Sequence, residues 1–281
     1  MTVSRIAWKT LSGDEDGGDG HGLTLAVDFT TSGRGQAQFA DLAGILAPHT
    51  AATVWASVPP PADADVAHDG EAYLDWWLGE VRDSGRHVEA VLGYCAGAVH
   101  AAALAERIAE WQHDAPQLLL FDPELPNTAG LYHDFHAAGD TLAGLLTPEE
   151  LAEFHAAGQR LEARYGDGEL PAAGAELAAV FTAAVGTAAE RLELDDDIRD
   201  ELAGAFDSLV GYLTAATTLD PLPAWSAATA LTTSAPAHPV GRELRQDTPH
   251  DDLLRDPATA RALAGLLDAG RAARTAHAGR Q

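Results

Sequence analysis

Short apolar runs alternate with helical segments through the first 130 residues of the chain. The apolar runs predict strands at residues 23–29, 53–58, 88–92 and 117–121. Helices are predicted between them, at residues 36–47, 71–84 and 98–111. Strands that alternate with helices of this length predict βαβ units and a mainly parallel α/β sheet flanked by helices.

The alternation stops between residues 130 and 220, where the pattern is almost wholly helical. Thr147-Pro148-Glu149-Glu150 predicts a helix start, with Thr147 as N-cap and Glu150 closing a capping box. We therefore expect a single domain over residues 1–281 with a helical lid inserted at 130–220. Three helices are expected in the lid: one that starts at Thr147 and ends at residue 165, one at 172–192 and one at 198–217. After the lid we expect strands at 225–232 and 241–246 and a final helix at 257–273.

The segment Gly93-Tyr94-Cys95-Ala96-Gly97 joins a predicted strand to a predicted helix. A nucleophile between two glycines in this context is the pattern of a nucleophile elbow, because side chains flanking such a strained turn would collide. Cys95 is the chain's single cysteine and stands where this pattern usually has serine. The alternative interpretation is a buried structural cysteine, which is the commonest fate of a free thiol.

A thiol attacks as its thiolate, so Cys95 needs a base beside it, and that base should be a histidine oriented by a carboxylate. His250 is the candidate, because a histidine after the last predicted strand overhangs the carboxyl ends of the strands. His238 is the second choice. Asp122, at the end of the strand after the elbow helix, is the candidate acid, and the loop at 232–240 offers no Asp or Glu. The alternative for Asp122 is a turn-initiating aspartate before a proline.

Acyl transfer also needs two backbone N–H groups to stabilise the negative charge that develops on the carbonyl oxygen. Ala96 should supply one, because it follows the nucleophile. Thr30 or Thr31, after the first predicted strand, should supply the other.

Composition narrows the possible partners. The 281 residues are 46% hydrophobic and 21% charged, as in a globular protein with ample core. A formal net charge of −26 disfavours nucleic acid and anionic membrane surfaces, because both would repel the protein. A single cysteine excludes an intramolecular disulfide. His133 and His136 stand three residues apart, which is weak support for a metal site without further ligands, so we expect neither a metal nor a cofactor.

Targeting signals are not evident in the sequence. We expect no apolar run to reach membrane-spanning length, and the residues after Met1 lack the hydrophobic core of a signal peptide. We therefore expect a cytoplasmic protein.

Three segments together resemble α/β-hydrolase thioesterases: the elbow at 93–97, Leu120-Phe-Asp-Pro-Glu-Leu-Pro126 and His250-Asp-Asp-Leu-Leu-Arg-Asp-Pro257. More narrowly, they are similar to the thioesterases of polyketide and nonribosomal peptide assembly lines, over about residues 23–267. In the integrated domains of that family the acid follows the strand after the elbow, as Asp122 does, whereas stand-alone members usually place it later. The resemblance implies a substrate held as a thioester on the phosphopantetheine arm of an acyl or peptidyl carrier protein.

The departure from that family is cysteine in place of serine. Cys95 would form a thioester acyl-enzyme, nearly isoenergetic with the incoming thioester, so transfer to another carrier thiol or an amine competes with hydrolysis. A few related cysteine enzymes shuttle aminoacyl groups in this way. Family frequency favours a thioesterase. An acyltransferase, a small ester or lactone hydrolase and a non-catalytic binding relative are the alternatives.

Overall fold

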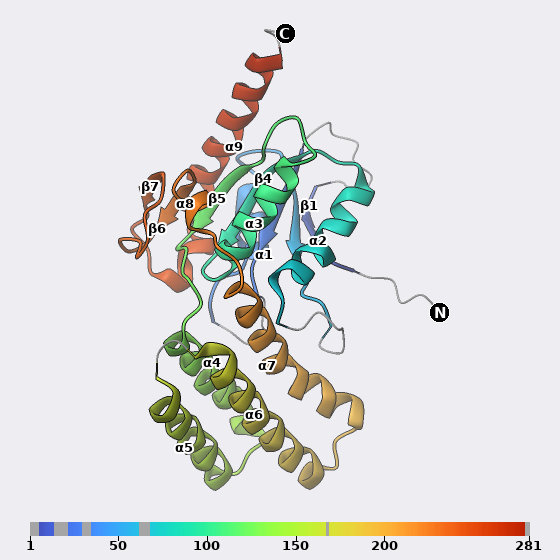
Figure 1. Cartoon of the computed structure of the whole chain (residues 1–281), viewed down its shortest axis with the longest axis vertical. Coiled ribbons are helices and arrows are strands. Elements are labelled where there is room, and N and C mark those ends of the chain that lie inside the picture. The colour runs from blue at the N-terminus through green and yellow to red at the C-terminus, as the bar shows by residue number, and fades with distance from the viewer. Residues whose placement is uncertain (1–5, 14–21, 30–34, 62–67, 167–168, 279–281) are drawn as a thin grey trace. The chain divides into compact units, whose positions relative to one another are not determined.

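The computed structural model describes residues 6–13, 22–29, 35–61, 68–166 and 169–278 (Figure 1). Within these ranges the strands form one seven-stranded sheet in the order β1-β3-β2-β4-β5-β6-β7. Strand β1 pairs antiparallel with β3, and every other neighbouring pair is parallel. The strands are β1 (Trp8–Ser12), β2 (Leu23–Val27), β3 (Thr53–Ser57), β4 (Val88–Tyr94), β5 (Gln117–Phe121), β6 (Thr229–Thr232) and β7 (Arg242–Arg245). The mainly parallel sheet predicted from the alternating pattern is confirmed.

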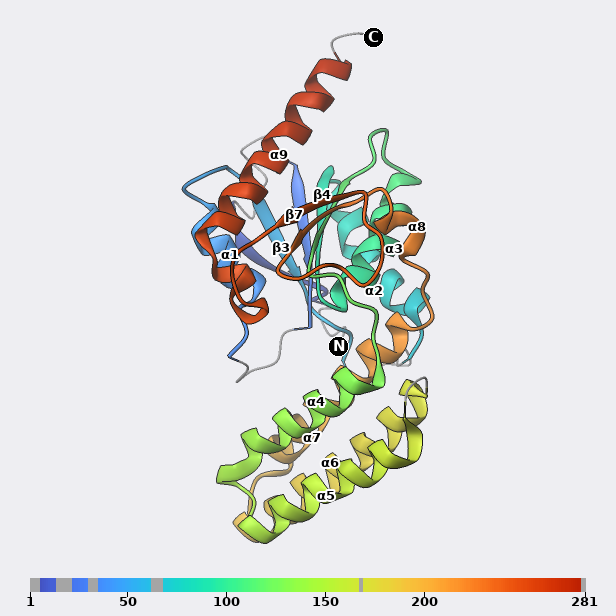
Figure 2. The ribbon, with the colours of Figure 1, turned by 90° about the vertical axis from the view of Figure 1, so that its left-hand side faces the viewer.

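Helices cover both faces of this sheet (Figure 2). Helices α1 (Phe39–Leu46) and α9 (Pro257–Ala278) lie on one face, and α2 (Gly70–Ser84), α3 (Gly97–Ala109) and α8 (Leu222–Trp225) lie on the other. Strands β2 and β4 are buried along their whole length, as expected of a parallel sheet covered on both sides. The carboxyl ends of the parallel strands therefore share one edge, where the loops can carry functional side chains.

The chain divides into two compact units. The first contains the sheet and comprises Met1–Pro59, Glu71–Leu125 and Leu219–Gln281; the second comprises Pro60–Gly70 and Pro126–Thr218. The described helices that lie within the second unit are α4 (Thr128–Thr141), α5 (Pro148–Tyr165), α6 (Leu170–Leu192) and α7 (Asp196–Ala216), with a short 3-10 helix at Leu142–Gly144. That a helical excursion interrupts the α/β pattern agrees with the sequence; its role as a lid stays a prediction.

The second unit has an aromatic core of its own. Phe135 stacks on Phe154 with ring centroids 4.1 Å apart, and Phe181 stacks on Phe206 at 5.1 Å. Gly158 allows α4 and α5 to approach, since a Cβ there would lie 2.7 Å from the Phe135 ring. Helix α5 starts with the predicted capping box: the Glu150 N–H donates to Thr147 Oγ1 at 3.2 Å, and the Thr147 N–H donates to Glu150 Oε2 at 2.7 Å.

Helix α6 corrects one sequence expectation. By length and composition it is long and apolar enough to cross a membrane. Of its most apolar stretch, 39% is buried. Leu177, Phe181 and Val185 are among the buried residues, and Phe181 contacts both Phe154 and Phe206. A core helix of a globular protein passes the same test of length and composition, so the finding is weak evidence for a membrane span.

Two elements differ from the sequence prediction. Strand β1 is an edge strand whose residues after Trp8 are partly or fully exposed, so it lacks the apolar run by which the other strands were found. The strand expected from residue 225 begins only at Thr229, because Leu222–Trp225 forms helix α8. Trp225 is fully buried and donates from Nε1 to the Ala98 carbonyl at 3.1 Å, which ties α8 to α3 rather than to the sheet.

A buried ion cluster attaches α9 to the central strand. Glu89 on β4 is 4% exposed and accepts a 2.9 Å hydrogen bond from Arg271 Nε, while Arg274 Nη2 lies 3.3 Å from the same carboxylate. The hydrogen bond to Glu89 raises the pKa of the Arg271 guanidinium above its ordinary value. The two arginines neutralise a carboxylate that would otherwise be costly to bury.

We expect Glu89→Gln to lower the free energy of unfolding by about 2–4 kcal/mol, because two partly buried guanidinium groups would lose the buried carboxylate that they share. Glu71→Gln is the matched control. Glu71 is 56% exposed in its pair with Arg107, so its loss should cost less than about 1 kcal/mol. Denaturant unfolding measures both variants, and equal losses would show that the buried cluster contributes no more than a surface pair.

Candidate active site

Cys95 lies in a strained turn between β4 and α3. Its φ angle is +51°, in the left-handed region that side-chain-bearing residues seldom adopt. The turn is held by hydrogen bonds on both sides: the Cys95 N–H donates to the Phe121 carbonyl at 3.0 Å, and the Ala98 N–H donates to the Cys95 carbonyl at 3.1 Å. Gly93 is needed for close packing, since a Cβ there would lie 2.6 Å from the Ala98 Cα. The strand-turn-helix context expected from the motif is therefore present.

The Cys95 thiol is half-buried, with one side against the core and one side accessible. This placement differs from that of a structural cysteine sealed in hydrocarbon. The thiol lies at the start of α3, whose positive end favours a thiolate. Its Sγ donates a long hydrogen bond, 4.0 Å, to Glu124 Oε2, and the Glu124 N–H donates to the Cys95 carbonyl at 3.3 Å.

Asp122 and His250, far apart in sequence, form a hydrogen-bonded pair. The distance from His250 Nδ1 to Asp122 Oδ2 is 2.8 Å. Asp122 follows β5 with a φ of +41°, and it also accepts hydrogen bonds of 2.7 Å from the Thr233 N–H and from Thr233 Oγ1. Three hydrogen-bond donors thus hold the Asp122 carboxylate, which is 10% exposed. An aspartate that only initiates a turn does not need so many donors.

The pair shifts both pKa values in opposite directions. Burial alone would raise the pKa of Asp122, but the hydrogen bonds from His250 and Thr233 outweigh it and lower that pKa below its ordinary value. The hydrogen bond to Asp122 raises the pKa of the His250 imidazole, against the opposing effect of burial. Asp122 therefore stays ionised and stabilises the imidazolium, and with Nδ1–H directed at Asp122 the neutral ring has its lone pair on Nε2.

Tyr94, the residue before Cys95, supports the other side of the imidazole. The Tyr94 and His250 rings stack with centroids 5.1 Å apart, and Tyr94 Oη lies 3.1 Å from His250 Nε2. Tyr94 Oη is also within donating distance, 3.0 Å, of the His250 carbonyl, and it accepts from Gln36 Nε2 at 2.8 Å. Burial raises the pKa of Tyr94 far above its ordinary value, so the phenol remains neutral.

The predicted oxyanion-hole residues are only partly within the described chain. Ala96 occupies the N-cap position of α3 with helical dihedral angles, so its N–H lies at the positive end of the helix; its part in an oxyanion hole stays a prediction. Thr30 and Thr31 lie outside the described residues, and their part stays a prediction.

The other candidate histidines lie elsewhere. The ring of His238 is 6.2 Å from that of Trp225. His136, in the helical unit, places its Nδ1 at 2.8 Å from His155 Nδ1, and His155 Nε2 lies 3.2 Å from Asp140. Among the residues that the structure describes, no group of three metal-ligating side chains converges.

Three site residues were missed by the sequence reasoning: Tyr94, Glu124 and Thr233. Signals for all three were present in the sequence. Tyr94 lies inside the elbow motif itself, and Thr233 directly follows β6, at the same edge of the sheet as Cys95 and Asp122. Glu124 lies inside the 120–126 segment that carries the resemblance, but its approach to the thiol depends on the fold of the loop after β5.

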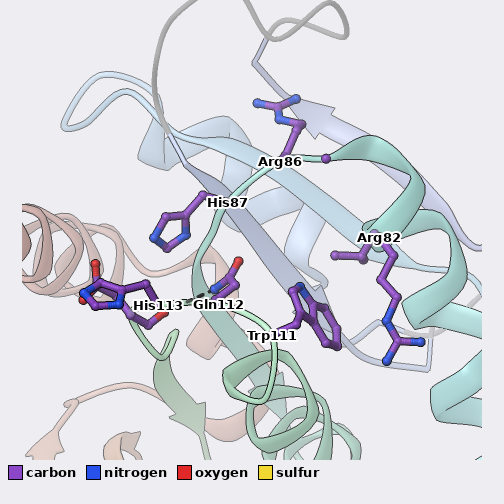
Figure 3. Close-up of a pocket in the computed structure, with 9 residues that line it drawn as sticks. Arg82, Arg86, His87, Trp111, Gln112 and His113 are labelled. Carbon is purple, nitrogen blue, oxygen red and sulfur yellow. Dashed lines mark hydrogen bonds between the residues drawn. The ribbon is translucent and has the colours of Figure 1, made fainter.

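A cavity of about 480 Å³ lies at the opposite end of β4, beside His87 and Gln112 (Figure 3). Trp111 lines the cavity, and the Arg82 guanidinium lies over its ring, with Cζ 4.4 Å from the ring centroid. Because His87 precedes β4 and Cys95 follows it, this cavity is separate from the candidate site.

No protein-family model and no curated protein matches this chain. Among solved structures, wild-type DBJA is 15% identical over 95% of this chain and 96% of its own, with a TM-score of 0.52. A loop variant of the haloalkane dehalogenase DbeA from Bradyrhizobium elkanii is also 15% identical, over 96% of this chain and 95% of its own, with a TM-score of 0.51. The Vlm2 thioesterase domain bound with a dodecadepsipeptide is 15% identical over 94% of this chain and 97% of its own, with a TM-score of 0.46. The chain has the α/β-hydrolase fold, as the sequence predicted.

We expect the His250 ring to titrate above the ordinary histidine pKa of 6.5, and Asp122→Asn to lower that pKa because it removes the strongest stabilisation of the imidazolium. Asp251→Asn is the control, since Asp251 acts on His250 only through space. NMR titration of the His250 ring protons gives the pKa of the imidazole in the unmodified protein and in both variants. An Asp122→Asn shift no larger than that of Asp251→Asn would contradict the proposed pairing.

Proposed function

We propose that this protein is an enzyme that processes acyl thioesters, with Cys95 as nucleophile, His250 as general base and Asp122 as the residue that positions His250. The observation that carries this proposal is the combination of a half-buried thiol in a left-handed turn with an Asp122–His250 pair at the same edge of the sheet. The α/β-hydrolase fold adds a scaffold on which such a triad is commonly built.

The chemistry requires a change of partner at His250 Nε2, which lies 3.1 Å from Tyr94 Oη. His250 Nε2 must leave Tyr94 Oη and take the proton from Cys95 Sγ as the sulfur attacks the acyl carbonyl carbon. The new bond joins Sγ to that carbon; the bond that breaks joins the carbon to the sulfur of the substrate thiol, which leaves with the proton from Nε2. The Ala96 N–H stabilises the oxyanion in between.

The substrate class is proposed from the motifs around Cys95, Asp122 and His250. Their resemblance to polyketide and nonribosomal peptide thioesterases supports a substrate carried on the phosphopantetheine arm of an acyl or peptidyl carrier protein. The cytoplasmic location and the lack of a further cofactor stay the expectations of the sequence analysis. A thioester acyl-enzyme can pass its acyl group to water, which makes the protein a thioesterase. It can also pass it to a second carrier thiol or an amine, and the cysteine in place of serine favours this second candidate function.

We expect an acyl-pantetheine or acyl-carrier substrate to add its acyl mass to the intact protein and Cys95→Ala to abolish the adduct. Decay of the adduct in buffer indicates hydrolysis, whereas persistence until a second carrier is added indicates transfer. A small ester or lactone hydrolase would acylate from esters and ignore carrier-bound thioesters. Absence of any adduct and of turnover across a panel of acyl groups would favour a non-catalytic relative.

We expect His250→Ala and Asp122→Asn each to slow acylation by roughly 10³–10⁴-fold, as losses of triad members do. Single-turnover kinetics with an acyl-pantetheine thioester measure the rate. His238→Ala is the control, because its ring lies beside Trp225, and it should leave the rate within about twofold of the unmodified protein. A near-normal rate in either triad variant would remove that residue from the mechanism.

A further inference from the structure

The hydroxyl of Tyr94 lies at the centre of three polar contacts. Its Oη is 3.1 Å from His250 Nε2 and 3.0 Å from the His250 carbonyl oxygen, and it accepts a hydrogen bond of 2.8 Å from Gln36 Nε2. Tyr94 is 2% exposed, and all three residues belong to the unit that contains the sheet. These distances are therefore set within one compact unit.

This hydroxyl can serve the His250 ring in either protonation state, because a phenol has one hydrogen to donate and two lone pairs that accept. When the ring is neutral, the phenol donates its hydrogen to Nε2. When the ring is protonated, Nε2–H donates to Oη and the phenol hydrogen turns to the His250 carbonyl. Gln36 donates to Oη in both arrangements. Burial raises the pKa of Tyr94, so the phenol keeps its hydrogen.

In both arrangements the phenol, rather than the Cys95 thiol, is the partner of Nε2. Among the residues that the structure describes, the hydrogen bonds of the two ring nitrogens of His250 are to Asp122 and to Tyr94. The Tyr94 and His250 rings also stack, 23° from parallel, which keeps the imidazole beside the phenol. A histidine activates a resting cysteine when its imidazolium N–H donates to the thiolate. Here that N–H is directed at Oη instead.

The charged groups near the ring do not replace that hydrogen bond. The carboxylates that act through space on His250 or on Tyr94 include those of Asp28, Asp122, Glu124 and Asp251. Negative charges favour the imidazolium and disfavour a thiolate. The start of α3 acts in the opposite sense. The protonation of the thiol therefore depends on whether Nε2–H is directed at the sulfur.

We propose that Tyr94 is a positioning residue that keeps His250 Nε2 bonded to its phenol in the free protein, so that Cys95 rests as a neutral thiol. The thiol proton then passes to Nε2 only as the sulfur attacks the acyl group. This inference rests on the proposed function, since it requires that His250 act on Cys95. It selects general-base removal of the proton over a preformed thiolate–imidazolium pair. A neutral thiol is also the form that resists alkylation and oxidation.

The test follows alkylation of Cys95, the chain's single cysteine, by iodoacetamide from about pH 5 to pH 10. The thiolate is the form that reacts, so the rate follows the thiolate fraction. For the unmodified protein we expect a single rise in the range where an ordinary thiol ionises, about pH 8–9. Tyr94→Phe removes Oη, keeps the ring and leaves Nε2–H free to donate to the thiolate. We expect it to raise the alkylation rate at pH 6.5 by about fivefold, the net effect of one hydrogen bond.

The control variant is Tyr132→Phe, which removes another buried phenol hydroxyl, one that donates to the Leu161 carbonyl in the helical unit. It should leave the alkylation profile unchanged. An alkylation rate that Tyr94→Phe does not raise overturns the positioning role, and so does a thiolate that already reacts fully below pH 7 in the unmodified protein. Both results leave acylation by thioesters, and with it the proposed function, intact. Failure of every acyl thioester to acylate the unmodified protein overturns the proposed function and this inference together.

Discussion

The candidate site depends on one backbone constraint, the left-handed conformation of Cys95 between β4 and α3. That conformation costs roughly 1–2 kcal/mol for a residue with a side chain. It persists because neighbouring elements hold the turn: the Phe121 carbonyl accepts from the Cys95 N–H, and the Cys95 carbonyl accepts from Ala98 and Glu124. Gly93 removes the Cβ that would separate the strand from the helix. The strain is thus offset by the sheet and the helix, and it exposes the sulfur at the edge where the other site residues lie.

The same edge explains why residues distant in sequence meet. Asp122 follows β5 and Thr233 follows β6, while His250 comes after β7, and the parallel pairing of these strands brings their carboxyl ends together. The imidazole is held on both nitrogens, by Asp122 at Nδ1 and by Tyr94 at Nε2. The first contact raises the pKa of the ring, and the second occupies Nε2 in this structure. The Glu124 carboxylate adds a negative charge, with Oε2 at 4.0 Å from Cys95 Sγ.

Much of this arrangement could be predicted from the chain. The strands β2, β4 and β5 are apolar runs bounded by polar residues, and the glycine-flanked cysteine identified the turn between β4 and α3. Pairing Asp122 with His250 needed only the rule that parallel strands end at one edge. Edge strand β1 and helix α8 were missed, because a partly exposed strand has little apolar signal and Trp225 is buried by tertiary contacts with α3. Thr30 and Thr31 lie outside the described residues, so their part in an oxyanion hole stays a prediction.

By itself the sequence determined the α/β class, the position of the elbow and the candidate nucleophile, acid and base, because each has a local signature in apolar runs, glycines and loop position. Tertiary structure alone decided what surrounds those groups. Tyr94 reaches the imidazole only because its ring and that of His250 stack, and Thr233 reaches Asp122 only because β6 pairs with β5. Glu124 approaches the sulfur only because the loop after β5 bonds back to the turn. Hydrogen bonds and charges of this kind depend on distances across the fold, and no local pattern of residues contains those distances.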